Sequence, residues 1–234
     1  MEVTVVTPTY NRRAFLPALI QIYRQQTFPK EKMEWIILDD GRDKVEDVFE
    51  EAAKIIPNVR YIRVEEKMRI GAKRNRLNRE ARGAIIIAMD DDDYYPPDRV
   101  AHAVAQYKKF PKIQLAGSSE MHLYNTDTQK IYVTGPFGPR HATNGTMAWR
   151  KTYSDTHLYN EFVTHAEEES FLENYRHPMI QLDPRKTILV LCHSDNTVDK
   201  SVLQLRTLPD HLEDRVKEPA LREFYYNLKH NKRD

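Results

Sequence analysis

The chain has 234 residues, of which 40% are hydrophobic and 30% charged, with a net charge of +1 and a mean hydropathy of −0.71. This composition is typical of a folded, polar protein and excludes disordered and collagen-like classes, and the balanced charge gives no overall attraction to nucleic acid or membranes. The length fits one large α/β domain better than two full domains.

The first part of the chain alternates between strand and helix patterns. Short apolar runs that end at turn signals predict four strands: Val3–Thr7, Trp35–Leu38, Val59–Val64 and Ala84–Met89. Apolar residues at helical spacing predict helices between them: Ala14–Ile22, Val45–Ala52 and Ile70–Ala81. Four units of this kind favour an α/β fold with a mostly parallel sheet and helices on both faces.

The pattern changes from about Ile113 onward. Short apolar runs such as Ile131–Val133 lie between Gly-Pro turns, which indicates an antiparallel or irregular second half. A helix is predicted over Ala166–Tyr175 and a strand over Thr187–Leu191. Leucines and aromatic residues among many charges predict a helical appendage over 201–234.

The chain carries no pattern of a targeting or membrane-spanning segment. Met1–Thr7 leads directly into a strand without a basic, signal-peptide-like region, and no apolar run reaches about 18 residues. Cys192 is the only cysteine, which excludes an intramolecular disulfide and a cysteine-clustered metal site. We therefore expect a cytoplasmic protein with no integral membrane segment and no nucleic-acid partner.

Four consecutive aspartates, Asp90–Asp93, follow the most apolar strand and are the strongest chemical signal. Adjacent carboxylates repel one another unless a cation lies among them, and ligands collect beyond the carboxyl ends of parallel strands. Hard oxygen ligands favour Mg²⁺ or Mn²⁺, which usually also bind substrate phosphates. The run predicts a metal site for a phosphorylated substrate; a ligand-free acidic turn is the alternative.

A second acidic pair, Asp39–Asp40, follows the second strand, where its loop would flank the same crevice. A turn or helix-capping role before Gly41 is equally open. The run Asp39–Asp43 also spells the DDxxD pattern of prenyl-diphosphate enzymes, but those carry it within the helices of all-α folds.

Three further groups are candidates for chemistry. Arg74, one turn into a helix after Gly71, is placed to meet an anion near the helix N-terminus, whereas Arg76 and Arg79 fit a solvated helix face. Glu167–Glu169 either interact with a helix dipole or supply a general base for a hydroxyl group. His193, at the end of the last strand, is either structural or a metal ligand.

Together these motifs resemble the inverting, metal-dependent glycosyltransferases of family 2, which have the GT-A fold. Four matching segments in the family's order cover roughly residues 1–110: Thr7–Asn11, Leu38–Gly41, Gly71–Asn75 and Met89–Asp98. Looser matches follow at Asn144–Arg150, Ala166–Leu172 and His193–Thr197. The resemblance implies a Rossmann-like nucleotide-sugar-binding half (1–110) and an irregular acceptor-side half (111–200) in one domain (1–200), followed by the appendage (201–234).

The resemblance also implies roles for individual residues. The donor-binding residues would be Thr7, Pro8, Thr9, Tyr10, Asp39, Arg69, Lys73, Arg74, Asp90 and Asp91. Asp39 would face the base, and Asp90–Asp92 would be the family's DXD signature, with Asp92 as the direct metal ligand and His193 completing its coordination. Thr146, Met147 and Trp149 would lie on the acceptor side.

Glu168 aligns with the family's catalytic base, although the usual Glu-Asp spelling is Glu-Glu here, which leaves Glu167 and Glu169 as substitutes. Arg42 stands where the family commonly has serine, so the loop around the diphosphate differs. The implied reaction moves a sugar, with inversion, from a nucleotide-sugar donor, preferably a UDP-sugar, to a glycan or other hydroxyl acceptor. Mn²⁺ or Mg²⁺ would be the cofactor.

Two rival functions stay open. A sugar-phosphate nucleotidyltransferase also uses a nucleotide and a divalent ion, but its class needs a glycine-rich loop after the first strand, and Thr7–Arg13 contains no glycine. A non-catalytic carbohydrate- or protein-binding module could use the 13 tyrosines for stacking. Such a module has no need of an acidic metal site beside a candidate base.

Overall fold

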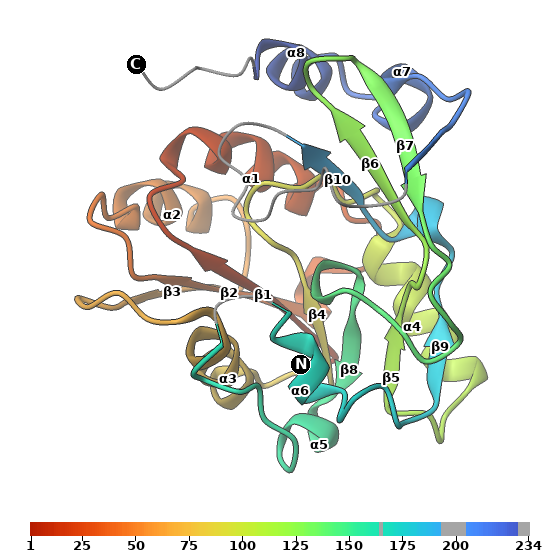
Figure 1. The fold of residues 1–234 in the computed structure, drawn as a ribbon. Helices are drawn as coiled ribbons and strands as arrows, with labels where there is room; N and C mark the ends of the chain where they lie inside the picture. The colour runs from red at the N-terminus through yellow and green to blue at the C-terminus, as the bar shows by residue number, and fades with distance from the viewer. Residues whose placement is uncertain (164–165, 193–204, 229–234) are drawn as a thin grey trace.

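A seven-stranded sheet forms the centre of the molecule, in the order β3-β2-β1-β4-β8-β5-β9 (Figure 1). It is seen in a computed structural model that describes residues 1–163, 166–192 and 205–228. The strands are β1 (Val3–Thr9), β2 (Met33–Asp39), β3 (Val59–Arg63), β4 (Ile85–Ala88), β5 (Leu115–Gly117), β8 (Ala148–Arg150) and β9 (Met179–Gln181). β1 to β4 pair in parallel, while β8 runs antiparallel to β4 and β5. The predicted mostly parallel α/β sheet is confirmed.

Helices cover both faces of this sheet, as predicted. The main helices are α1 (Leu16–Arg24), α2 (Glu46–Ala53), α3 (Ile70–Glu80) and α4 (Arg99–Lys109), with the short α5 (Lys151–Ser154) and α6 (Glu168–Phe171). Alternate residues of β1 point to opposite faces: Val5 packs in a core with α1, α2 and α4, whereas Val6 packs with α3, α5 and α6. Because both faces are covered, β1, β2 and β4 are buried along their whole length, and the buried polar side chains of Thr4 and Glu34 hydrogen-bond to each other.

A smaller four-stranded sheet, in the order β10-β6-β7-β11, lies beside the main one (Figure 1). Its strands are β6 (Met121–Asn125), β7 (Lys130–Thr134), β10 (Leu189–Cys192) and β11 (Arg206–Thr207). β6 and β7 form an antiparallel hairpin, whereas β10 runs parallel to β6. The four 3₁₀ helices among the described residues are η1 (Arg13–Phe15), η2 (Lys30–Lys32), η3 (Asn144–Thr146) and η4 (Pro184–Lys186).

The described part of the predicted appendage contains the strand β11 and the helices α7 (Leu212–Arg215) and α8 (Pro219–Asn227). Its aromatic side chains pack onto the body of the protein: the ring of Phe224 lies 5.7 Å from that of Phe15, and the ring of Tyr225 lies 6.3 Å from that of Tyr94. The appendage therefore shares the main hydrophobic core. A domain boundary near residue 200 stays a prediction.

The helix predicted over Ala166–Tyr175 is present but much shorter than expected. Only the four residues of α6 are helical, because Ala166, Glu173, Asn174 and Tyr175 all have positive φ angles, between 47° and 58°. Right-handed helix requires negative φ, so the helix can extend in neither direction. The predicted strand Thr187–Leu191 is displaced to Leu189–Cys192. Among the described residues, no helix combines the length and apolar character needed to cross a bilayer.

Candidate active site

The loops that follow β1, β2 and β4 meet at one edge of the main sheet. Thr7 joins the three strands, because its Oγ1 donates a hydrogen bond to the Met89 carbonyl oxygen at 2.7 Å and accepts one from Trp35 Nε1 at 2.9 Å. Pro8 pairs with Leu38 in the parallel register. Thr7, Pro8 and Thr9 are all buried and support this edge of the sheet. Their contact with a donor stays a prediction.

Asp39 organises the loop after β2. Its Oδ1 accepts a hydrogen bond from the Gly41 N–H at 2.8 Å, and its Oδ2 accepts from the Val45 N–H at 3.1 Å and the Tyr61 hydroxyl at 2.6 Å. Burial and the hydrogen bond to Asp39 raise the pKa of Tyr61, which keeps that hydroxyl a donor. The structure therefore shows the turn role of Asp39, while its contact with a nucleotide base stays a prediction.

Asp40 forms a buried ion pair with Lys73 of α3. Its Oδ2 also accepts a hydrogen bond from the Met68 N–H at 2.6 Å, which fixes the chain just before α3. Burial lowers the pKa of Lys73, and Asp40 opposes that effect. The Lys73 and Lys67 ammonium groups lie 5.5 and 4.3 Å from the Tyr10 ring centroid. The lysine predicted to bind the donor is thus fixed at the same edge, next to Tyr10.

Arg74 links two acidic segments that are far apart in the sequence. Its Nη1 lies 3.1 Å from Asp90 Oδ1, and its Nε lies 2.7 Å from Glu167 Oε1. Both Arg74 and Glu167 are more than 90% buried. The predicted anion-binding arginine therefore aligns the acidic loop after β4 with the segment that opens α6. Arg69, by contrast, is exposed and donates to the Phe162 carbonyl oxygen at 2.7 Å.

Further contacts shape the acidic run itself. The Asp90 N–H donates to the Tyr95 hydroxyl at 2.7 Å, and Asp92 lies 3.4 Å from Arg12 Nη2. Asp93 accepts a hydrogen bond from the Leu191 N–H at 2.9 Å. This last bond brings β10, which ends at Cys192, against the acidic run. His193 lies outside the described residues, so its role as a metal ligand stays a prediction.

Asp91 gives the run the character of a cation site. It is 9% exposed, and its Oδ2 is a buried oxygen without a hydrogen-bond partner among the described residues. Burial, followed by the neighbouring Asp92 carboxylate, raises the pKa of Asp91. A divalent cation would stabilise the charged carboxylate against both effects. Carboxylate oxygens are the ligands that Mg²⁺ and Mn²⁺ favour, so the donor set fits either ion.

The three glutamates that open α6 differ in their surroundings. Glu167 is buried and paired with Arg74, whereas Glu169 is exposed. Burial, followed by the charge of Glu167, raises the pKa of Glu168 to about 7. A carboxyl group that ionises near neutral pH is suited to general-base catalysis. Of the three, Glu168 therefore has the properties of the predicted base.

The residues predicted on the acceptor side lie in the interior. Thr146 and Met147 are 0% exposed and Trp149 is 1% exposed. Trp149 Nε1 donates to Asn78 Oδ1 at 3.2 Å, and its ring packs edge-on against Phe171 of α6. They form the packed layer on which α6 rests. Their contact with an acceptor stays a prediction that this burial does not support.

Sequence reasoning missed two arginines that shape this region. Arg12 reaches Asp92, and its position after the first strand, next to Arg13, was the available signal. Arg99 is fully buried and donates through Nη2 to the carbonyl oxygens of Thr146 and Met147 at 2.9 and 2.8 Å. Only the folded structure shows that Arg99 holds the segment that leads into β8, the strand next to β4.

Comparison of the sequence with curated proteins finds glycosyltransferases. An uncharacterized glycosyltransferase of Haemophilus influenzae is 30% identical over 138 residues, which are 58% of this chain and 45% of that protein. The poly(ribitol-phosphate) beta-N-acetylglucosaminyltransferase TarS of Staphylococcus aureus is 27% identical over 107 residues, which are 45% of this chain and 18% of TarS. The alignments thus cover less than half the length of these relatives.

Solved structures show the same fold. The crystal structure of S. aureus TarS 1-349 matches with a TM-score of 0.67 at 17% identity, over 82% of this chain and 60% of that one. The mannosyltransferase PcManGT from Pyrobaculum calidifontis, in complex with GDP-Man and Mn²⁺, matches with a TM-score of 0.65 at 16% identity, over 86% and 58%. These likenesses confirm the predicted GT-A-like fold. Since the model of Glycosyl transferase family 2 matches residues 4–160, more than half of the sequence, the chain belongs to that family.

Proposed function

We propose that this protein transfers a sugar from a nucleotide-diphosphate donor, a UDP-sugar, to an acceptor hydroxyl, with inversion at the anomeric carbon. The observation that carries the proposal is the position of Glu168 next to the Arg74–Glu167 pair, with a pKa of about 7. Family membership supports the reaction class. The S. aureus relative TarS has been crystallised with UDP and with UDP-GlcNAc, which supports the choice of donor.

The acidic run is the proposed site of a divalent cation. Asp92 and the unpartnered oxygen of Asp91 would hold Mn²⁺ or Mg²⁺, with His193 as a third ligand. The crystal structure of PcManGT with GDP-Man and Mn²⁺ supports manganese. When bound, the ion supplies positive charge against the departing nucleoside diphosphate, an effect of several kcal/mol. Lys73 and Arg74 lie at the same edge of the sheet, where each is ion-paired, Lys73 with Asp40 and Arg74 with Asp90 and Glu167.

Glu168 is the proposed general base. Its carboxylate takes the proton of the acceptor hydroxyl while that oxygen bonds to the anomeric carbon, on the side opposite the diphosphate. The bond between the anomeric carbon and the phosphate oxygen breaks at the same time, and the electron pair leaves with the nucleoside diphosphate. The configuration therefore inverts. Positioned base catalysis contributes about 10²- to 10⁴-fold.

A comparison of neighbouring glutamates tests this assignment. Glu168→Gln should lower turnover by about 10²- to 10⁴-fold and leave UDP binding unchanged. Glu169→Gln, at the exposed neighbour, is the matched control and should keep turnover near the wild-type value. Wild-type turnover in Glu168→Gln would reject the base, and retention of configuration in the product, read by NMR, would reject the direct displacement. Pyrophosphate release from a sugar phosphate and a nucleoside triphosphate would favour the nucleotidyltransferase instead.

A further inference from the structure

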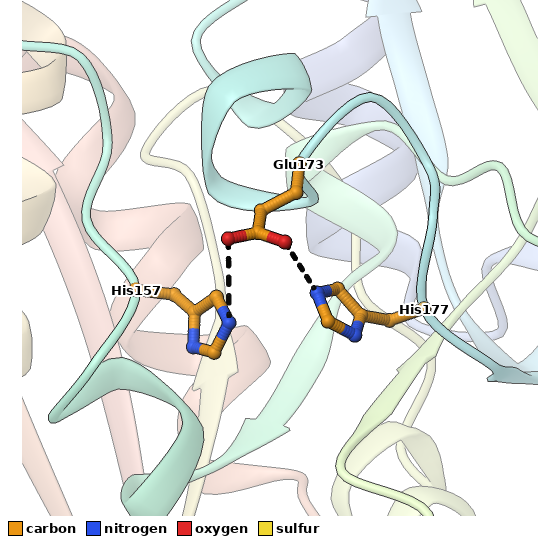
Figure 2. Close-up of side chains that lie close together, drawn as sticks. All are labelled: His157, Glu173 and His177. Atoms are coloured by element: carbon orange, nitrogen blue, oxygen red, sulfur yellow. Dashed lines mark hydrogen bonds and ion pairs between the residues drawn. The ribbon is translucent and has the colours of Figure 1, made fainter.

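Three side chains with metal-binding atoms converge next to α6, outside the proposed donor site: His157, Glu173 and His177 (Figure 2). His157 follows α5, and the other two follow α6. His177 Nε2 lies 3.0 Å from Glu173 Oε2, and His157 Nε2 lies 3.7 Å from Glu173 Oε1. One ligand atom of each residue lies within 4.8 Å of the other two. Two segments of the chain are thereby brought to one point.

The separations match those around a small tetrahedral ion. Zinc binds imidazole nitrogen at about 2.0–2.1 Å and carboxylate oxygen at about 2.0–2.2 Å, so two of its ligand atoms lie roughly 3.3 Å apart. The 3.0 Å from His177 Nε2 to Oε2 and the 3.7 Å from His157 Nε2 to Oε1 lie on either side of this value, and they end on different oxygens of Glu173. With one ligand atom from each residue, the three atoms lie within 4.8 Å of one another. Two imidazoles and one carboxylate suit Zn²⁺ better than Mg²⁺ or Mn²⁺, which prefer all-oxygen sites.

The local contacts of His157 turn its Nε2 toward Glu173. Its Nδ1 lies 3.0 Å from the Tyr153 carbonyl oxygen and 2.9 Å from the Thr156 hydroxyl oxygen, so the chain already engages that nitrogen. Nε2 is the ring nitrogen that faces Glu173. The 3.7 Å between Nε2 and the carboxylate is too long for a hydrogen bond, so a cation between them would satisfy both.

Packing holds both histidine rings in place. Tyr153 stacks on His157 with ring centroids 3.9 Å apart and an interplanar angle of 5°, and it meets His177 edge-on at 5.5 Å. The Tyr153 hydroxyl donates to the Phe171 carbonyl oxygen at 2.7 Å, which ties this cluster to the end of α6. Side chains fixed before binding lose little freedom when a ligand arrives.

The backbone at Glu173 also requires an external constraint. Glu173, Asn174 and Tyr175 are three successive residues with φ angles of 47°, 56° and 58°. Residues with side chains rarely adopt this left-handed conformation, and it persists only where surrounding contacts impose it. Among the described residues, two contacts compete with a metal for Glu173 Oε2. The first is the hydrogen bond from His177 Nε2 at 3.0 Å, whose proton a metal ion would displace. The second is Arg176 Nη1 at 3.7 Å, but the Arg176 side chain is 74% exposed and can turn into solvent.

We propose that His157, Glu173 and His177 form a zinc site that fixes the chain on both sides of α6, with water as the fourth ligand. The existence of this site does not depend on the proposed function. The effect of the zinc ion on the reaction does depend on the proposed function. Because α6 begins at Glu168 and ends two residues before Glu173, the ion would position the proposed base, Glu168, without contacting the donor.

Zinc binding to the full chain, first stripped of metal with EDTA, tests the proposal by competition against a chromophoric chelator. We expect one Zn²⁺ per chain that excess Mg²⁺ does not displace. His177→Gln, His157→Gln and Glu173→Gln should each weaken its binding about tenfold or more. Asp92→Asn should bind this Zn²⁺ as the wild type does, since the acidic run is a separate site. Arg176→Gln, the matched control, removes a neighbouring cation but no ligand and should keep or tighten zinc binding.

Two further readouts keep the proposal falsifiable if a variant fails to fold. Zinc should raise the melting temperature of the wild type, because it binds only the folded chain. Co²⁺ in place of Zn²⁺ should give the intense visible absorption of a tetrahedral site. Failure to bind zinc, unchanged affinity in the three ligand variants, or the weak spectrum of octahedral cobalt would overturn the proposal and would mean that the three side chains form an ion-pair cluster only.

Discussion

The Nε of Arg74 lies 2.7 Å from Oε1 of Glu167, a residue 93 positions later in the chain. Through Nη1 the same guanidinium reaches Asp90 at 3.1 Å. The pair neutralises Glu167 at the position directly before Glu168, whose pKa is raised by burial and by Glu167. The two adjacent glutamates therefore differ: Glu167 is ion-paired with Arg74, whereas Glu168, the proposed base, has a pKa of about 7.

The pH dependence of the reaction should follow Glu168. Its pKa of about 7 lies above the ordinary value of 4.5, so the folded protein favours the protonated form. Below about pH 7, kcat/KM should fall about tenfold per pH unit, because the base is protonated. The measurement is kcat/KM from about pH 5 to 9 at saturating Mn²⁺. A midpoint near 4.5 would contradict the assignment.

Glu168 should also make the free energy of unfolding depend on pH, in the direction opposite to that of kcat/KM. Its folded-state pKa is raised, so its contribution to the free energy of unfolding is largest below about pH 4.5 and is lost as the pH rises to about 7. Glu168→Gln should remove this part of the pH dependence. Urea denaturation of both proteins at about pH 5 and 8 checks it; identical pH dependence in the two would show that Glu168 is not perturbed.

Arg74→Met should disrupt both stability and activity. It leaves Glu167 buried without its cation, which costs about 3–5 kcal/mol of unfolding free energy. Arg74→Lys keeps the charge but cannot span Asp90 and Glu167 together, so it should recover part of the stability and little of the turnover. Arg79→Met, on an exposed position of the same helix, should change the unfolding free energy by less than about 0.5 kcal/mol. Equal effects at Arg74 and Arg79 would disprove a linking role.

Gly71 allows α3 to approach the chain that leads to α6. A Cβ atom at this position would lie 2.2 Å from the Asn160 carbonyl oxygen, so Gly71→Ala must push the two segments apart. We expect a loss of about 1–3 kcal/mol in the free energy of unfolding, measured in urea. Wild-type stability in this variant would mean that the contact is loose.

The first half of the fold was predictable because strands buried on both faces read as continuous apolar runs. The strands predicted at Trp35–Leu38 and Ala84–Met89 agree with β2 and β4 within two residues. α4 was not predicted, although Val100, Ala103, Val104 and Tyr107 have helical spacing.

The region around α6 was not predictable from the local pattern. The glutamates at 167–169 are typical of a helix start, and the apolar residues that follow them favour a longer helix. In the structure, Leu172 caps α6, and the left-handed residues Glu173, Asn174 and Tyr175 follow it. These residues also contact distant parts of the chain, since Tyr175 stacks on His141 and Glu173 lies 3.7 Å from His157, and the local sequence does not indicate such contacts.

The candidate site was predictable in its motifs but not in its pairings. Acidic residues after β2 and β4 had to meet at one edge, because parallel strands end on the same side. The contacts of Arg12 with Asp92 and of Arg74 with Glu167 depend on how the loops pack, so no spacing in the sequence indicates them. The same holds for His157, which reaches Glu173 only through the fold.

The most direct test of the central claim is the affinity for UDP, measured by calorimetry with and without Mn²⁺ in the wild type and in Asp92→Ala. If the acidic run binds a cation against the nucleotide phosphates, Mn²⁺ should tighten UDP binding about tenfold or more in the wild type and have no such effect in the variant. Equal UDP affinity with and without Mn²⁺ in the wild type would contradict the account.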